Sequence, residues 1–187
     1  WLQLLSEIFP ALAHVAILRS ANPQAKVVLP AIEEAAAGLK LRSAVVDIER
    51  GDIEQTLGEA TREPNTGLLV LPGAATLAQR NSIVGFAGKH RLPAIYSNAA
   101  FARVGGLISY GVDRRERMMQ AANYVSRILK GERPANLPVQ MPTVFELIIN
   151  LRAAAMLDLS TPSHLRVLAN ELLDVLAIEQ LVWEGEQ

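Results

Sequence analysis

Four short runs rich in valine, isoleucine and leucine recur along the first hundred residues, and they constrain the fold more than any other feature. They cover residues 14–20, 41–48, 67–71 and 92–96. Each run has little polar alternation, as expected for strands covered on both faces in a parallel sheet. Helical patterns lie between the runs, and such strand–helix units favour a doubly wound sheet with right-handed crossovers. The sequence therefore predicts an α/β fold, a Rossmann-like parallel sheet with helices on both faces.

The predicted helices have their own start and stop signals. Asn22-Pro23 offers an N-cap and a first-turn proline for a helix that ends near Gly38. Pro30 falls inside it and is expected to kink the helix or delay its start. Asp52 is placed to cap the next helix. A third helix is predicted over about residues 75–88.

The pattern changes after residue 99. Residues 105–111 form a strand between glycines, and Asp113 can cap a following helix with an apolar stripe that ends at Lys130-Gly131. Three prolines then punctuate residues 134–142, which favours an extended connector between two bodies. Residues 144–151 are predicted as another strand. Thr161-Pro162 is predicted to begin an amphipathic helix that continues through Leu172 to residue 175 or 176.

Composition excludes several classes of function. The 187 residues include 18 basic and 19 acidic side chains, which give a formal charge of −1. This near-neutral charge predicts no basic surface large enough to bind a nucleic acid or an anionic membrane. The absence of cysteine excludes disulfides, thiolate catalysis and cysteine-bound zinc. No apolar stretch approaches the roughly 20 residues that span a bilayer. Because the chain begins with Trp1, we expect it to be a piece of a longer product.

Motifs for catalysis or metal binding are not found. His14, His90 and His164 are isolated from one another and from other ligand types at helical spacing. The sequence contains no GxSxG elbow, no P-loop and no GxGxxG after its first strand. We therefore expect neither an enzyme nor a cofactor.

The carboxyl ends of the predicted strands are the better candidates for a ligand site, because open α/β sheets bind ligands there. Helices begin just beyond these ends, so their N–H groups favour an anionic group such as a carboxylate. Asn22 and Asp113 either cap helices alone or also contact ligand, and Tyr96 either stacks on a flat ligand or belongs to the core. The candidate ligand-binding residues are Ser20, Asn22, Gly73, Ala74, Ala75, Thr76, Tyr96, Ser97, Asn98 and Asp113.

Several segments together resemble a known family. The segments RSANP, LLVLPG, LPAIY, GGLISYG and LPVQMPTVFELIINL are similar to those of ABC transporter substrate-binding proteins of the tryptophan/tyrosine-binding type, over residues 1 to about 160. The resemblance implies a type I periplasmic binding protein, in which two lobes close on a hinge around a ligand without catalysis. Residues 163–187 depart from the short ending that the resemblance leads us to expect.

The resemblance also implies a division into lobes. Residues 1–103 with 143–187 would form lobe two, and residues 104–142 would be a remnant of lobe one with hinge connectors. In relatives that bind aromatic amino acids, the second ligand loop holds acidic or amide side chains, whereas Gly73, Ala74 and Ala75 stand here. This departure favours a less polar ligand, such as an aromatic acid, with Asp113 as the available partner for a ligand ammonium.

The functional hypothesis is therefore the substrate-binding component of an ABC importer, which captures an amino acid or an aromatic or other organic acid. Its implied partners are the small-molecule ligand and a transporter permease. Its implied location is periplasmic, or extracytoplasmic with a lipid anchor. The alternatives are the effector-sensing domain of a transcriptional regulator and a nucleotide-using α/β enzyme. Without the rest of lobe one, residues 104–142 would expose an apolar face, which predicts a homodimer or domain swap.

Overall fold

The computed structural model describes residues 1–48 and 52–174, and its strands form one seven-stranded sheet in the order β2-β1-β3-β4-β5-β6-β7. β1 pairs in parallel with β2 and β3, and the parallel pairing continues through β4 to β5. β6 runs antiparallel to β5 and parallel to β7. The strands are β1 (His14–Arg19), β2 (Arg42–Asp47), β3 (Thr66–Val70), β4 (Ala94–Tyr96), β5 (Ile108–Val112), β6 (Phe145–Asn150) and β7 (Glu171–Leu173).

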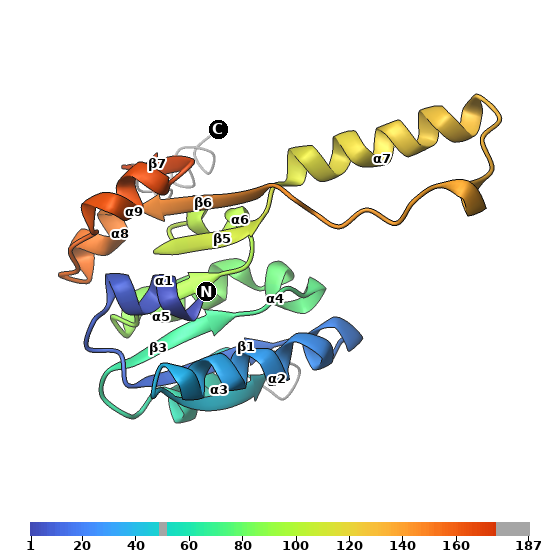
Figure 1. Cartoon of the computed structure of the whole chain (residues 1–187). Helices are drawn as coiled ribbons and strands as arrows, with labels where there is room; N and C mark the ends of the chain where they lie inside the picture. Colours follow the sequence, from blue (N-terminus) through green and yellow to red (C-terminus); the bar gives the residue numbers. More distant parts are fainter. Residues whose placement is uncertain (49–51, 175–187) are drawn as a thin grey trace, which may run out of the picture.

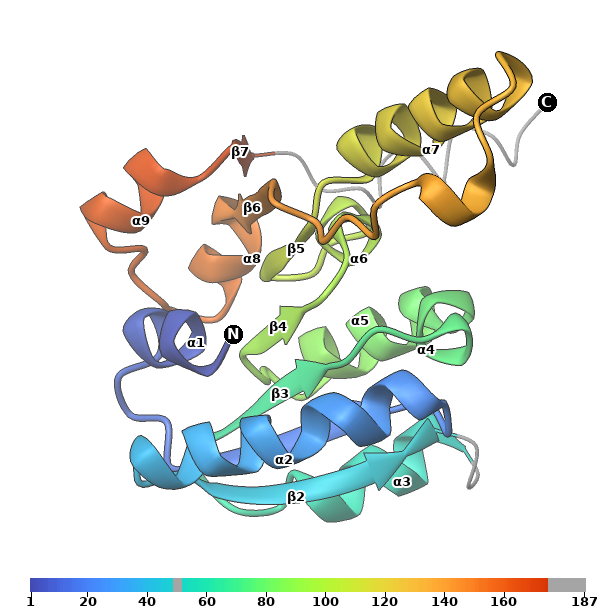
Figure 2. The same ribbon diagram turned by 45° about the vertical axis from the view of Figure 1, so that its right-hand side comes forward.

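Helices cover both faces of this sheet (Figures 1 and 2). They are α1 (Leu2–Ile8), α2 (Pro23–Gly38), α3 (Ile53–Ala60), α4 (Ala74–Ala78), α5 (Arg80–Lys89), α6 (Ala99–Arg103), α7 (Arg114–Leu129), α8 (Leu151–Met156) and α9 (Ser163–Leu168), with a 3-10 turn η2 (Pro134–Asn136). The predicted α/β fold with a largely parallel sheet is confirmed. Among the described residues, no helix combines the length and apolarity needed to cross a membrane.

Alternate residues of the central strands feed two hydrophobic cores. In β1, Val15 and Ile17 belong to the core under α1, α2, α8 and α9, whereas Ala16 and Leu18 belong to the core under α3, α5 and α6. All four side chains are buried. Because side chains alternate across a strand, a strand buried on both faces must be apolar at every position. This requirement explains the apolar runs of the central strands β1 and β3, whereas the edge strand β2 exposes four of its six residues, so the expectation that it is covered on both faces is wrong.

One predicted helix is divided in two in the structure, and another keeps its predicted start. The helix predicted over residues 75–88 is divided into α4 and α5 at Gln79. The reason is that the two pieces are anchored separately: α4 buries Thr76, whose hydroxyl bonds backbone carbonyls, whereas α5 buries Ile83, Phe86 and Ala87 in the core. α2, by contrast, begins at Pro23 as predicted and contains Pro30 without a delayed start.

The helix predicted from Thr161-Pro162 to residue 175 or 176 is wrong in its length. α9 ends at Leu168, and β7 then pairs with β6. Asn170 makes the change: its backbone N–H donates to the Leu147 carbonyl, and its side-chain oxygen accepts from the Leu147 N–H, both at 2.8 Å. Completing the edge of the sheet thus replaces helix continuation. Residues 175 and 176 lie outside the described residues.

Residues 113–144 leave the sheet body and are here called the arm. The arm contains α7, η2 and an extended return segment, and both figures show it projecting away from the sheet (Figures 1 and 2). β5 lies within residues 104–142, the segment predicted to be a remnant of lobe one with hinge connectors. In the structure this strand pairs with β4 and β6 in the main sheet. α7 has no buried residue, and Met118, Val125 and Leu129 are exposed along it.

Candidate ligand-binding site

The candidate site residues follow four neighbouring parallel strands, β1, β3, β4 and β5, so they gather at one edge of the sheet. β1 lies between β2 and β3, so the chain changes direction across the sheet between β1 and β3. In open α/β sheets this switch point is the usual place for a ligand. Ser20 follows β1 at this point, and Gly73 follows β3.

Ser20 carries an unusual hydroxyl at the switch point. Its residue is 4% exposed, and its Oγ has no hydrogen-bond partner within the described part of the chain. A Cβ added to Gly73 would lie 2.1 Å from this Oγ, so only glycine leaves room for the hydroxyl there. A buried hydroxyl without a partner is costly, which is why most such groups are satisfied. Ser20 is therefore the strongest candidate to bond a ligand.

The side chain of Thr76 holds the loop after β3 in place, so its hydroxyl is not free to bind a ligand. The Thr76 hydroxyl donates to the Leu71 carbonyl at 3.1 Å and to the Gly73 carbonyl at 2.9 Å, and the residue is buried. Ala74 is exposed, and Ala75 packs partly buried against the core under α3, α5 and α6. This loop offers backbone and small side chains to a ligand.

Asn22 joins the first two loops. Its side-chain oxygen accepts from the Ala25 N–H at 2.7 Å and caps α2, while its amide donates to the Pro72 carbonyl at 3.2 Å. The predicted capping role is thus confirmed, and the loops after β1 and β3 are tied together. A ligand contact for Asn22 stays a prediction.

Tyr96 belongs to the core and not to an open surface. It is 1% exposed, and its ring stacks on that of Phe101 with centroids 4.8 Å apart and planes 11° apart. Burial raises the pKa of its hydroxyl above the ordinary value. Of the two predicted alternatives, stacking on a flat ligand or belonging to the core, the structure therefore shows Tyr96 as a core residue.

The loop after β4 is half-open. Ser97 is partly buried, and its N–H donates to the Val70 carbonyl at 3.2 Å. Asn98 is exposed and caps α6 by accepting from the Ala100 N–H at 2.9 Å. Both side chains lie at the same edge as Ser20, one strand beyond Gly73 in the sheet.

Asp113 stands at the base of the arm. Its carboxylate caps α7 by accepting from the N–H groups of Arg115 at 2.7 Å and Glu116 at 3.2 Å. The predicted cap is therefore present, and the carboxylate is already engaged by backbone donors. A ligand ammonium would have to share it.

One charged pair at this edge was not predicted. Arg19 and Asp47 end β1 and β2 in register, and Arg19 Nε lies 2.6 Å from Asp47 Oδ1. Their side chains are mostly buried, at 22% and 14% exposure. The signal in the sequence was a charged residue at the end of each of two apolar runs.

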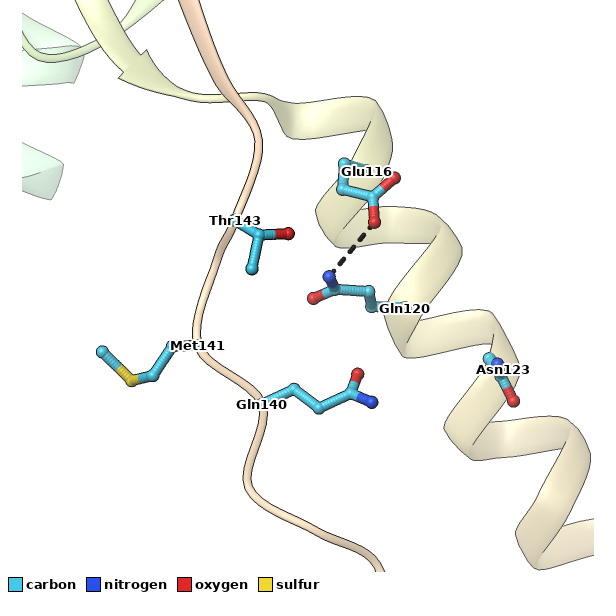
Figure 3. Close-up of a pocket in the computed structure, with 6 residues that line it drawn as sticks. All are labelled: Glu116, Gln120, Asn123, Gln140, Met141 and Thr143. Atoms are coloured by element: carbon cyan, nitrogen blue, oxygen red, sulfur yellow. Dashed lines mark hydrogen bonds between the residues drawn. The ribbon is translucent and has the colours of Figure 1, made fainter.

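A hollow lies on the arm and not at the switch point (Figure 3). It encloses about 540 Å³ between α7 and the return segment. Gln120 donates to the Glu116 carboxylate across its wall at 3.2 Å. The remaining lining residues are Asn123, Gln140, Met141 and Thr143. In the described part of the chain, no cluster of three or more histidine, aspartate or glutamate side chains is arranged to hold a metal ion.

The sheet and its edge of capped loops form an α/β lobe with a candidate ligand site at the carboxyl ends of its parallel strands. The family model described as ABC transporter substrate binding protein matches residues 2–173, so the chain belongs to this family. The match extends beyond residue 160, where the resemblance found in the sequence ends, as far as residue 173. A search of curated proteins returned no match.

Solved structures share the fold at low sequence identity. The ABC domain in complex with L-Trp from Streptococcus pneumonia is similar with a TM-score of 0.84 and 20% identity, over 91% of this chain and 58% of that one. A conserved domain protein from Vibrio cholerae is similar with a TM-score of 0.78 and 21% identity, over the same shares. A ligand-free, open substrate-binding protein from Clostridium difficile reaches 0.65 at 18% identity, over 87% and 55%. The chain thus spans under three fifths of each of these structures.

Proposed function

We propose that this chain forms one lobe and the hinge segments of a substrate-binding protein that delivers a small organic solute to an ABC importer. The observation that carries the proposal is the Ser20 hydroxyl, buried without a partner at the β1/β3 switch point. A solute oxygen there would accept from this hydroxyl and relieve its unsatisfied state. Membership in the family supports the role, and the permease of the importer is the implied protein partner.

The lobes follow the division made from the sequence. Residues 1–103 with 143–187 would form lobe two, and of residues 104–142 the strand β5 pairs within that same sheet, so that the arm is the part that would belong with lobe one and the hinge. The projecting arm, whose helix has no buried side chain, supports a second body that covers it. The ligand would then lie between the sheet edge of lobe two and that second body.

The ligand we propose is an amino acid or an aromatic or other organic acid. α2, a helix of 16 residues, begins three positions after Ser20, at Pro23, and helix N-termini favour a carboxylate. Gly73, Ala74 and Ala75 offer no charged side chain, which favours a ligand of low polarity beyond its acid group. The similar Streptococcus structure contains L-Trp, which places aromatic acids and amino acids first among the compounds to test.

The proposed location is extracytoplasmic, in the periplasm or at a lipid anchor. Fractionation of cells that express the full-length gene product would test it, with recovery in the cytosol as the contrary result. Such recovery would favour an effector-sensing role.

The direct test is calorimetry on the full-length product with a panel of aromatic acids and amino acids. Ser20→Ala should raise the dissociation constant of the compound that binds about 5-fold, because one hydrogen bond is worth about 1 kcal/mol. Ser109→Ala is the matched control, since Ser109 Oγ is also buried without a partner but is not among the candidate site residues. An empty panel, or equal losses in both variants, would argue against the proposal.

A further inference from the structure

The orientation of the arm is decided at one small joint. Within the described residues, the chain passes between the sheet body and the arm only twice, from β5 into α7 and from the return segment into β6. β5 and β6 pair antiparallel up to Val112 and Phe145, and the Asp113 N–H then donates to the Val144 carbonyl at 3.1 Å. Because α7 buries no residue, its side chains do not fix the arm against the body.

Aromatic side chains occupy this joint. Tyr110 of β5 and Phe145 of β6 stack with ring centroids 5.6 Å apart and planes 18° apart. The Trp1 indole N–H donates to the Tyr110 carbonyl, and both Trp1 and Tyr110 pack against the core under α1 and α2. Residues from three distant parts of the sequence therefore meet where the arm begins. Stacked pairs of this kind contribute beyond their buried area.

The same strand touches the candidate ligand loop. A Cβ added to Gly111 would lie 2.2 Å from the Ser97 carbonyl oxygen and 3.0 Å from its carbon. The backbone of β5 thus lies directly against the Ser97-Asn98 loop. A rotation of the end of β5 cannot occur without displacing this loop.

We propose that Trp1, Tyr110 and Phe145 form an aromatic clamp that sets the orientation of the arm, and that the Gly111–Ser97 contact couples this orientation to the ligand loop. Trp1 and Tyr110 attach the clamp to the core, and Phe145, which is 44% exposed, stacks on Tyr110 from the second crossing. Glycine at 111 permits the close approach that transmits movement. The coupling half of the inference rests on the proposed function of the Ser97-Asn98 loop, whereas the clamp itself does not.

The clamp can be tested by pulsed electron paramagnetic resonance without any ligand. The chain has no cysteine, so spin labels can be placed at Glu59→Cys on α3 and Ser126→Cys on α7, both exposed sites. Diluting the labelled protein with unlabelled protein removes the contribution of distances between spin labels on different molecules. We expect one narrow distance distribution for the parent protein. Phe145→Ala should widen it at least twofold, and Phe145→Tyr, which keeps the ring, should not.

Leu129→Ala, at an exposed site on the arm, is the control for general loosening and should leave the distribution unchanged. Gly111→Ala should shift the mean distance, whereas Gly58→Ala, with nothing within 4 Å of the added Cβ, should not. Circular dichroism checks folding, and Phe145→Leu replaces Phe145→Ala if that variant does not fold.

An unchanged distribution in the variant that removes the ring would overturn the clamp, as would equal widening in Leu129→Ala. An unshifted distance in Gly111→Ala would overturn the coupling. Because no ligand is used, these outcomes are independent of the calorimetric panel, whose failure would count against the proposed function alone.

Discussion

Replacing Ser20 by alanine should make the protein more stable while it weakens ligand binding. A buried hydroxyl without a partner costs about 1–3 kcal/mol relative to a satisfied one. Ser20 is 4% exposed and its Oγ has no partner, so Ser20→Ala removes this cost and leaves a gap of only one oxygen atom. We expect the free energy of unfolding to rise by about 1 kcal/mol.

Thr76 provides the matched comparison a few ångströms away. A Cβ on Gly73 would lie 3.1 Å from Thr76 Oγ1, so the two hydroxyls flank the same glycine. The Thr76 hydroxyl bonds two carbonyls, and Thr76→Val is nearly equal in volume. This variant should lose about 1–2 kcal/mol, because it removes the donor to the Leu71 carbonyl, whereas the Gly73 carbonyl still accepts from the Leu77 N–H.

Urea denaturation followed by circular dichroism measures both variants. If the dependence of the unfolding free energy on urea concentration is unchanged and only the urea midpoint shifts, the variant and the parent differ in stability. For a chain of this size, about 1 kcal/mol corresponds to a shift of roughly 2–4 °C in Tm. If Ser20→Ala is as destabilising as Thr76→Val, the Ser20 hydroxyl is satisfied in the folded protein and the switch-point site loses its free donor.

Three further predictions concern the arm and the surface. Asp113→Ala should reduce the helicity of α7 by circular dichroism and cost about 1 kcal/mol, whereas Asp113→Asn should retain the cap. Hydrogen bonds from the side chains of Lys89, which contributes most, and of His90 hold the pKa of the Glu54 carboxyl below its ordinary value. Stability from Glu54 is therefore present above the unfolded pKa and lost as the pH falls through the lowered one. The urea midpoints of Glu54→Gln and the parent should accordingly differ at pH 7 and converge as the pH falls below the lowered pKa; a gap independent of pH would contradict this origin. Finally, sedimentation of this chain alone should reveal a homodimer or domain swap through the exposed arm, and a compact monomer with the arm unprotected from hydrogen exchange would contradict it.

The sheet was predictable because its physical requirement is local. A strand buried on both faces needs apolar residues at successive positions, and the runs at 14–20 and 67–71 fulfil this without reference to the rest of the chain. β1 and β3 accordingly begin and end within one residue of the predicted bounds. The capping side chains of Asn22 and Asp113 are equally local, since each acts on the helix that it precedes.

The elements that were missed depend on distant partners. β7 forms because the edge of β6 is free and Asn170 can exchange hydrogen bonds with Leu147, more than twenty residues earlier. The apolar periodicity after residue 163 suits a helix just as well, so only the position of the sheet edge decides the outcome. The break at Gln79 has the same character, because it follows from where α4 and α5 are anchored.

The site presents a sharper version of this problem. Helix caps and ligand contacts require the same residue types at the same strand ends, so a sequence pattern cannot separate them. The structure assigns hydrogen bonds to Asn22, Asn98 and Asp113 as caps and to Thr76 as a loop support. Among the candidate site residues, Ser20 is left as the buried polar side chain whose hydrogen-bonding capacity is unused, as is that of Ser109 outside the site, and no property of residue 20 in isolation predicts this. It results from Gly73, fifty-three positions away, being small enough to enclose the hydroxyl without bonding it.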